Sequence, residues 1–439
     1  MNISVIGLGK LGACSAACFA SKGFNVVGVD VRADYVDSIN RGITLIQEPG
    51  LQELIQKSKT RLRATLNFAE AISETDMTFL IVPTPSQENG SFSDRFLRDA
   101  LLPLSTALRT STKPYHVFAV TSTVSPGTTE QSLIPLIESG SGRKLNEGFG
   151  VCYNPEFIAL GSVIKDFLKP DLVLIGESDG KTGDQVERVY RSVCENQPRI
   201  ARMSIVSAEI TKISLNSYVT MKISFANTLS SLCEKIPGAH VDDITAALGA
   251  DRRISPYYLK GGLSFGGPCF PRDNRAFAAF AQQYGKDARL AKATDAVNLD
   301  QISHVVEKIL PTLSESKSVS VLGLSYKPNT PVIEESPATK IIEELLARDV
   351  RVVVYDPLAL DEARLHFGEK ISYARSVREC LSASALTLVA TQDDAFRTID
   401  ASMISQNPTT IVDCWRILDP SKLGSSVRYI ALGIPQQDN

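Results

Sequence analysis

The chain has 439 residues, of which 43% are hydrophobic and 22% are charged, and its formal net charge is −3. This composition is typical of a soluble enzyme of two or three domains. It provides no basic face for nucleic acid, and neither a polybasic run nor about 18 consecutive apolar residues indicates a membrane. Glycines interrupt the apolar N-terminus, which lacks the positive start of a secretory signal. We therefore expect a cytoplasmic protein with no nucleic-acid or membrane partner.

The first 200 residues alternate between strand and helix patterns. Ile3–Ile6 is expected to be a strand, Lys10–Lys22 a helix and Phe24–Val29 a second strand. Further buried strands are expected at Met77–Val82, Val117–Thr121 and Leu172–Ile175. Alternation of this kind predicts a parallel sheet with helices on both faces.

The centre of the chain reads as one long helix. Residues 204–235 contain neither Pro nor Gly, and apolar residues recur at helical spacing: Ile210, Ile213, Tyr218, Met221, Phe225, Leu229 and Leu232. A helix of about 30 residues must bury this stripe against the flanking domains or against a second copy of the chain.

A second alternating region begins near residue 318. Strands are expected at Val319–Leu322, Val350–Tyr355, Ala385–Ala390 and Thr410–Val412, with a helix at Ala338–Ala347. The layout is therefore an α/β region, a helical centre and another α/β region.

Gly7-Leu8-Gly9-Lys10-Leu11-Gly12 is a GxGxxG that follows a predicted strand and opens a helix. The next strand ends at Asp30, where a carboxylate accepts hydrogen bonds from the adenosine ribose of NAD. Arg32 leaves open a contact with the 2′-phosphate of NADP. We expect NAD, with Gly7, Gly9, Lys10, Leu11, Gly12, Asp30 and Arg32 around it.

Two polar turns follow predicted strands at the edge where open α/β folds bind ligands. They contain Pro83 with Thr84, and Ser122 with Thr123. Read alone, either is a structural turn or part of a site; we place Pro83, Thr84 and Thr123 at the cofactor.

Gly266–Asp273, with the sequence GGPCFPRD, is too rich in Gly and Pro to read as a strand or helix, and it carries Cys269. A thiol can hold an aldehyde covalently while a cofactor removes hydride. A reactive thiol together with a bound NAD predicts an oxidation that continues from the aldehyde to the acid. The other seven cysteines are scattered, and no cysteine and histidine have the spacing of zinc ligands, so we expect no metal.

These blocks resemble the UDP-glucose/GDP-mannose dehydrogenases, the nucleotide-sugar 6-dehydrogenases. Eight blocks match in the family's order: Gly7–Gly12, Val82–Pro85, Ser122–Thr129, Asn154–Phe157, Lys212 with Asn216, Gly266–Asp273, Gly323–Lys327 and Asp356 with Pro357. The resemblance implies an α/β fold of two Rossmann-like doubly wound domains joined by a long central helix that forms a homodimer. It places an NAD-binding domain at 1–203, a central helical domain with the cysteine loop at 204–300, and a nucleotide-sugar-binding domain at 301–439.

The implied reaction is the NAD-dependent, four-electron oxidation of a nucleotide sugar at C6, with UDP-glucose favoured and polysaccharide biosynthesis the expected use. Cys269 would form a thiohemiacetal and then a thioester. Lys212 and Asn216, four apart on the helix, would steady negative charge on the C6 oxygen. Asp273, Glu156 and Thr123 would position or deprotonate water. The resemblance also places the following residues at the substrate: Glu156, Lys212, Asn216, Arg253 (from a partner subunit), Tyr258, Lys260, Gly266, Tyr326, Lys327 and Arg416.

Three positions depart from the family pattern. Leu160 stands where many members have a second glutamate, Glu334 where many have an arginine, and Pro268 where Ser or His is usual. The lack of a His before the cysteine favours UDP-glucose or GDP-mannose over a UDP-N-acetylhexosamine. Two other functions stay open: a two-electron hydroxyacid-type dehydrogenase, and a protein that binds NAD and nucleotide without turnover.

Overall fold

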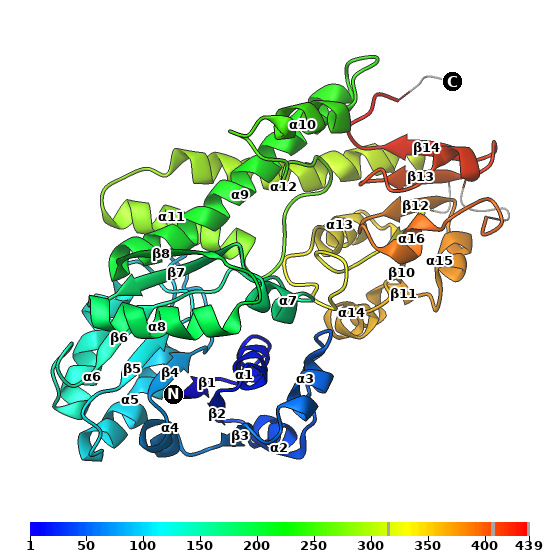
Figure 1. Ribbon diagram of the computed structural model, residues 1–439. Helices are drawn as coiled ribbons and strands as arrows, with labels where there is room; N and C mark the ends of the chain where they lie inside the picture. Colours follow the sequence, from blue (N-terminus) through cyan, green and yellow to red (C-terminus); the bar gives the residue numbers. More distant parts are fainter. Residues whose placement is uncertain (314–316, 405–408, 437–439) are drawn as a thin grey trace. The chain divides into compact units, whose positions relative to one another are not determined.

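The computed structural model describes residues 1–313, 317–404 and 409–436. The chain divides into two compact units, Met1–Ser214 and Leu215–Asn439. In Figure 1 the first unit runs from blue to green and the second from green to red. None of the helices in the described ranges is both long and apolar enough to cross a membrane.

The first unit is built on an eight-stranded sheet with the strand order β3-β2-β1-β4-β5-β6-β7-β8 (Figure 1). Its strands are β1 (Asn2–Ile6), β2 (Asn25–Val29), β3 (Leu62–Thr65), β4 (Met77–Leu80), β5 (Val117–Val120), β6 (Gly150–Tyr153), β7 (Leu172–Glu177) and β8 (Arg199–Ser204). Neighbouring strands are parallel except β6 and β7. The order reverses between β1 and β4, and ligands of open α/β sheets bind at such a switch point.

Helices cover both faces of this sheet. They are α1 (Gly12–Ser21), α2 (Ala33–Arg41), α3 (Leu51–Lys57), α4 (Phe68–Glu74), α5 (Arg95–Thr110), α6 (Ile134–Ser141), α7 (Val163–Leu168) and α8 (Gly180–Val193), with the π-helical turn η1 (Thr129–Leu133) before α6. One apolar cluster joins β1 to α1, α3, α7 and α8, and another joins it to α4, α5 and α6. Strands buried on both faces explain why the sequence shows continuous apolar runs there.

The second unit contains a six-stranded parallel sheet with the order β11-β10-β9-β12-β13-β14. Its strands are β9 (Ser318–Leu322), β10 (Arg351–Tyr355), β11 (Ser372–Tyr373), β12 (Leu386–Val389), β13 (Thr410–Asp413) and β14 (Arg428–Ala431). Its helices are α10 (Val241–Ala250), α11 (Phe270–Gln283), α12 (Arg289–Ile309), α13 (Pro337–Leu346), α14 (Leu360–Phe367), α15 (Val377–Ala383) and α16 (Asp394–Arg397), with short 3-10 turns η2 (Leu310–Thr312), η3 (Gly368–Lys370) and η4 (Pro420–Lys422). Both sheets therefore share the strand order of a dinucleotide-binding fold, which confirms the predicted fold class.

The long helix α9 spans Ile205–Cys233, within two residues of its predicted ends. The boundary between the two units falls inside it, after Ser214. Its predicted apolar stripe is only partly buried: Ile213 is fully buried, but Tyr218, Phe225 and Leu232 are 58%, 52% and 54% exposed. These three residues are seven apart, so they lie along one side of the helix.

The prediction that residues 266–273 contain no helix is wrong for the last four. Helix α11 begins at Phe270, directly after Cys269. Pro271 lies in its first turn, where a missing backbone N–H costs nothing because that group has no partner inside the helix. The proline that argued against a helix is therefore one that opens it.

Candidate active site

The glycine-rich loop after β1 has the geometry that a dinucleotide requires. Gly7 has a positive φ of 92°, and a Cβ there would lie 2.3 Å from the carbonyl oxygen of Ile81. A Cβ on Gly12 would lie 1.8 Å from the carbonyl oxygen of Gly7, whereas one on Gly9 would meet nothing within 4 Å. The outer glycines thus permit packing, and Gly9 leaves the open approach that a pyrophosphate needs at the start of α1. Lys10 and Leu11 lie between this opening and the helix.

Asp30 supports this loop from the end of β2. Its Oδ2 accepts a hydrogen bond of 2.6 Å from the backbone N–H of Leu8, and its Oδ1 accepts one of 2.9 Å from that of Arg32. Four lone-pair sites on a carboxylate leave capacity for ribose hydroxyls. The Arg32 guanidinium pairs with Asp34 and lies 4.1 Å over the ring of Tyr35, so a 2′-phosphate would have to compete with Asp34 for it. This arrangement fits NAD.

The turns after β4 and β5 are tied together. The Thr84 hydroxyl donates to the backbone carbonyl of Thr123 at 2.6 Å, and the Ser122 hydroxyl donates to that of Val82 at 2.7 Å. Thr84 is buried, and Pro83 before it is exposed. The structure therefore brings both predicted turns to the carboxyl edge of adjacent strands, beside the glycine-rich loop after β1.

A buried carboxylate that the sequence analysis missed anchors the loop after Thr123. Glu209 on α9 is fully buried and accepts hydrogen bonds from the backbone N–H groups of Gly127 (2.6 Å) and Thr129 (3.0 Å). Burial raises the pKa of Glu209. On a helix face, a glutamate three residues before Lys212 carries no signal that distinguishes it from a surface acid.

Lys212 and Glu156 meet inside the first unit. The Lys212 Nζ donates to the backbone carbonyl of Glu156 at 2.7 Å and lies 4.6 Å from the ring centre of Phe157. The Glu156 Oε1 accepts a hydrogen bond of 2.6 Å from the hydroxyl of Tyr190. Burial raises the pKa of Glu156 to about 7, against the opposing effects of Tyr190 and Lys212. A carboxyl with this pKa exchanges protons near neutral pH, as general acid–base catalysis requires.

Leu160, the residue in place of a second family glutamate, lies against the apolar cluster on the α1 side of the first sheet. Its side chain therefore contributes packing and no proton exchange. Nearby, Glu48 caps the start of α7: its carboxylate accepts from the backbone N–H groups of Gly161 and Val163, both at 2.8 Å. Glu156 is therefore the acid that the Asn154–Phe157 segment and Leu160 leave at this position.

Cys269 is the residue that caps α11 in the second unit, and it is the one exposed cysteine of the eight. The positive end of a helix favours a thiolate. Six of the other cysteines are buried, and burial raises the pKa of Cys14, Cys152 and Cys414, for example, far above the ordinary value. Among the eight cysteines, Cys269 alone combines exposure with a position at a helix N-terminus.

Asn216 and Asp273 also meet, within the second unit. The Asn216 Nδ2 donates a hydrogen bond of 2.7 Å to Oδ2 of Asp273, and both residues are buried. Asp273 lies in the first turn of α11, four residues after Cys269. The next residue, Asn274, accepts from the Ser217 hydroxyl at 2.7 Å and donates to Asp295 at 2.8 Å. These bonds fasten α11 to α9 and α12.

The glycines before Cys269 pack tightly on the segment that follows β9. A Cβ on Gly266 would lie 2.2 Å from the carbonyl oxygen of Glu335, and one on Gly267 would lie 2.5 Å from the ring of Tyr326. Tyr326 and its neighbour Lys327 are half-buried. Glu334 is exposed, and its backbone carbonyl accepts a hydrogen bond of 3.1 Å from the N–H of Gly267. Glu334 thus holds the cysteine loop through its backbone.

Arg416 is engaged inside the chain. Its guanidinium donates to both oxygens of Asp242 (2.8 and 2.7 Å) and to the carbonyls of Gly261 and Leu432, both at 2.7 Å. Only 5% of its side chain is exposed. Lys260, one residue before Gly261, donates to Gln392 at 3.3 Å, and burial lowers the pKa of Lys260.

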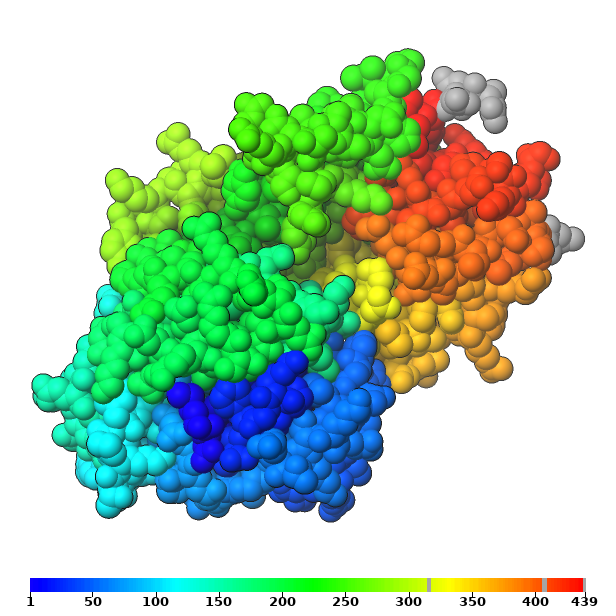
Figure 2. Space-filling view, viewed as in Figure 1, coloured from blue at the N-terminus to red at the C-terminus, as the bar shows by residue number. Residues whose placement is uncertain are grey.

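The loop after α10 presents further predicted substrate residues at the surface. Tyr258 is 53% exposed, and its ring lies 5.8 Å from that of Phe270, the residue after Cys269. Lys222 on α9 donates to three carbonyls of this loop, at Ile254, Ser255 and Tyr257. Arg253 is exposed and pairs with Asp251 at 2.6 Å. In Figure 2 the green helix α10 lies at the surface.

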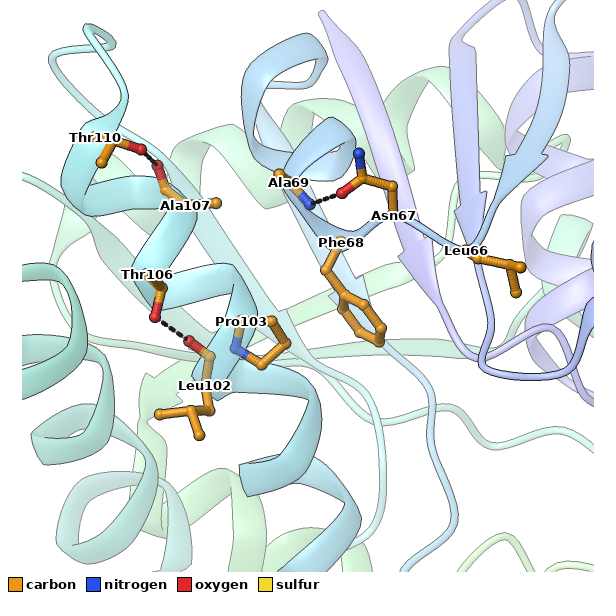
Figure 3. A pocket seen from close by; sticks show the side chains of 9 residues that line it. All are labelled: Leu66, Asn67, Phe68, Ala69, Leu102, Pro103, Thr106, Ala107 and Thr110. Atoms are coloured by element: carbon orange, nitrogen blue, oxygen red, sulfur yellow. Dashed lines mark hydrogen bonds between the residues drawn. The ribbon is translucent and has the colours of Figure 1, made fainter.

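A separate groove lies between the start of α4 and the second half of α5 (Figure 3). Its lining comprises Leu66, Asn67, Phe68, Ala69, Leu102, Pro103, Thr106, Ala107 and Thr110. No residue with a predicted cofactor or substrate role belongs to this set.

Comparison with known proteins identifies the family. The NAD-binding, central and UDP-binding domains of the UDP-glucose/GDP-mannose dehydrogenase family match residues 1–194, 206–300 and 320–420. The chain belongs to the UDP-glucose/GDP-mannose dehydrogenase family. As a member, it is an NAD-dependent nucleotide-sugar 6-dehydrogenase, which confirms the predicted class of enzyme and cofactor.

Relatives match over nearly their whole length. The UDP-glucose 6-dehydrogenase AglM of Haloferax volcanii is 36% identical, over 95% of this chain and 97% of that protein. A GDP-mannose 6-dehydrogenase of Pseudomonas syringae is 33% identical, over 91% and 93%. The solved structure of a UDP-glucose dehydrogenase from Pyrobaculum islandicum has 31% identity and a TM-score of 0.87, covering 96% of this chain and 98% of that one. The family thus contains relatives with different sugar substrates at similar identity.

Proposed function

We propose that the chain oxidises UDP-glucose to UDP-glucuronate by four electrons, through a thiohemiacetal and a thioester on Cys269. The observation that carries the proposal is the position of Cys269, which is exposed at the N-terminus of α11, four residues before Asp273 of the buried Asn216–Asp273 pair. A two-electron dehydrogenase needs no such thiol. UDP-glucose is favoured by the 36% identity to the Haloferax enzyme, and the lack of a His before the cysteine argues against a UDP-N-acetylhexosamine.

NAD, held by the loop of Gly7, Gly9 and Gly12 and by Asp30, would accept a hydride in each oxidation. In the first, Glu156 would act as the base through a water that Thr123 positions, and it would receive the proton of the C6 hydroxyl. The resulting aldehyde is attacked by the Cys269 thiolate, which forms a C–S bond and places negative charge on the C6 oxygen. Lys212 and Asn216 stabilise that charge.

After the second oxidation the sugar is a thioester of Cys269. Water adds to its carbonyl carbon, a carboxylate base takes the proton, and the C–S bond breaks to release the thiolate and the uronate. Glu156 is suited to act as this base because burial raises its pKa to about 7. Asp273 would orient the water or the thiol from the first turn of α11.

GDP-mannose is the second candidate substrate, since Pseudomonas relatives at 33% identity bear that name. The experiment is a plate of nucleotide sugars with NAD or NADP, in which NADH formed is counted against sugar consumed. UDP-glucose with NAD should give two NADH per sugar. One NADH per sugar would favour the hydroxyacid-type reaction, and binding without NADH would favour a protein without turnover.

We also propose that two copies pair through α9 and that Arg253 reaches the partner's substrate. Support comes from the exposed row of Tyr218, Phe225 and Leu232, since an apolar row seven residues apart is the pattern of a helix that packs on another. A cytoplasmic enzyme that supplies uronate for polysaccharide biosynthesis is the corresponding cellular role.

A further inference from the structure

Tyr190 lies at the buried end of the Glu156 carboxylate. It belongs to the apolar face of α8, is 2% exposed, and its ring centre is 6.1 Å from that of Phe167. A tyrosine hydroxyl in such surroundings needs a hydrogen-bond partner. It finds one in Oε1 of Glu156 at 2.6 Å, a short bond of the kind formed with an ionised acceptor.

Groups from three elements surround Glu156. Lys212 on α9 is the cation, but its Nζ bonds the backbone carbonyl of Glu156 and not the carboxylate. Cys18 on α1 and Cys194 after α8 are close enough for the Glu156 charge to raise the pKa of each thiol, behind the larger effect of burial. Within the described ranges, no hydrogen bond reaches Oε2 of Glu156, so Tyr190 is the carboxylate's one hydrogen-bond donor there.

We propose that Tyr190 is a positioning residue for the hydrolytic step: its hydroxyl fixes Oε1 of Glu156 and leaves Oε2 to take the proton of the attacking water. This inference rests on the proposed function, because it assigns Glu156 to release of the sugar acid from Cys269. Leu160 makes the assignment sharper, since that position supplies no second acid. Tyr190 itself does not touch substrate.

The hydrogen bond also sets the pH at which the step works. A donor to a carboxylate favours the ionised form, so the Tyr190 hydroxyl lowers the pKa of Glu156, which burial holds at about 7. Without the hydroxyl, Glu156 stays protonated to higher pH and cannot accept a proton from water. Hydrogen bonds to charged groups are strong enough that the acid limb should rise by about one to two pH units.

The test compares Tyr190→Phe with Tyr115→Phe. The control removes a tyrosine hydroxyl that also bonds α8, at Thr182 over 2.9 Å, but has no link to Glu156. For each protein, the rate of uronate formation is followed from pH 5.5 to 9.5 beside the burst of the first NADH. We expect the acid limb of Tyr190→Phe to rise, with the rate recovering at high pH and the burst little changed at high pH. An unshifted limb, or an equal loss at every pH, would overturn the proposal.

An infrared titration of the substrate-free protein separates this inference from the proposed function. The carboxylic-acid band that disappears in Glu156→Gln should titrate at higher pH in Tyr190→Phe than in wild type. If no variant or wild type turns over a nucleotide sugar, the proposed function fails while this titration still decides the Tyr190–Glu156 link. If Tyr190→Phe does not fold, the tyrosine C–O band of wild type decides, because it changes as Glu156 ionises only when the two are bonded.

Discussion

Asn216 donates a hydrogen bond of 2.7 Å to the Oδ2 of Asp273, and neither side chain is more than 6% exposed. The other oxygen of Asp273 is 3.5 Å from Nε of Arg272 and accepts no hydrogen bond from the described residues. The buried pair therefore fixes the first turn of α11, where Cys269 is the cap, against α9. Variants can move the negative charge from position 273 to position 216 while keeping a hydrogen bond between the two side chains.

Exchanging the two residues should restore stability but not activity. Asn216→Asp places two carboxylates together and removes the amide donor, so we expect kcat to fall by about 10²–10³-fold. Asp273→Asn keeps an acceptor oxygen but makes the hydrogen bond a neutral one, and should cost about 1 kcal/mol of the free energy of unfolding. The double variant re-forms one hydrogen bond and should recover stability in urea unfolding with kcat still low. Recovery of kcat in the double variant would mean that the carboxylate works equally well on α9 and on α11.

Alanine substitutions at two glycines of the nucleotide loop should affect different properties: NAD binding for Gly9 and stability for Gly12. A Cβ on Gly9 meets nothing within 4 Å, so Gly9→Ala should fold normally but obstruct the pyrophosphate. We expect the dissociation constant for NAD to rise by roughly tenfold or more, about 1.4 kcal/mol. Gly12→Ala, with a Cβ 1.8 Å from the Gly7 carbonyl oxygen, should lose about 1–3 kcal/mol of stability. Calorimetric NAD binding and urea unfolding should be measured for both variants. Equal losses of affinity and of stability in the two variants would refute the prediction.

Glu156→Gln should stabilise the protein at alkaline pH. The pKa of Glu156 is near 7 when folded, above its ordinary value of 4.5, so the folded state holds more protons than the unfolded state between these values. The stability of wild type therefore falls as pH rises from 4.5 to 7, by at most about 3 kcal/mol. Unfolding free energies of Glu156→Gln and wild type should converge near pH 4.5 and diverge above pH 7. A constant difference would show that Glu156 does not titrate with folding.

Phe225→Glu should separate the proposed dimer. Phe225 is 52% exposed, in the middle of the row from Tyr218 to Leu232, and a charge there opposes burial against a second helix. Sedimentation should show a monomer for this variant. Leu365→Glu on α14 changes a residue that is 85% exposed and should leave the wild-type mass. Equal masses for wild type and both variants would show that α9 does not form the dimer interface.

Much of the fold was predictable because its strands are buried on both faces. The run Val117–Val120 is apolar without interruption, Ser318–Leu322 is buried along its whole length, and Asp30 follows β2 at the expected place. The edge strand β8 was missed because Arg199–Ser204 is half-exposed and contains two arginines. Rossmann-like order in both sheets followed from the resemblance and is confirmed by strand pairing.

The candidate site was less predictable where one side chain acts through another. The Gly- and Pro-rich loop drew attention to Cys269, and the family resemblance added Lys212 and Asp273; the roles of all three stay predictions. The sequence did not locate Tyr190, which reads as an apolar-face residue of an amphipathic helix until its hydroxyl is placed beside Glu156. The sequence also did not show that the Arg416 guanidinium donates hydrogen bonds to Asp242, Gly261 and Leu432, which are distant from it in the chain.

The most direct measurement is the yield of NADH and uronate per UDP-glucose for wild type, Cys269→Ala and the control Cys194→Ala. Cys194 is the other cysteine that is not fully buried. The thioester account predicts two NADH and one uronate for wild type and for Cys194→Ala. It predicts no uronate for Cys269→Ala, since water then has no thioester to attack. Uronate from Cys269→Ala at near wild-type rate would contradict it.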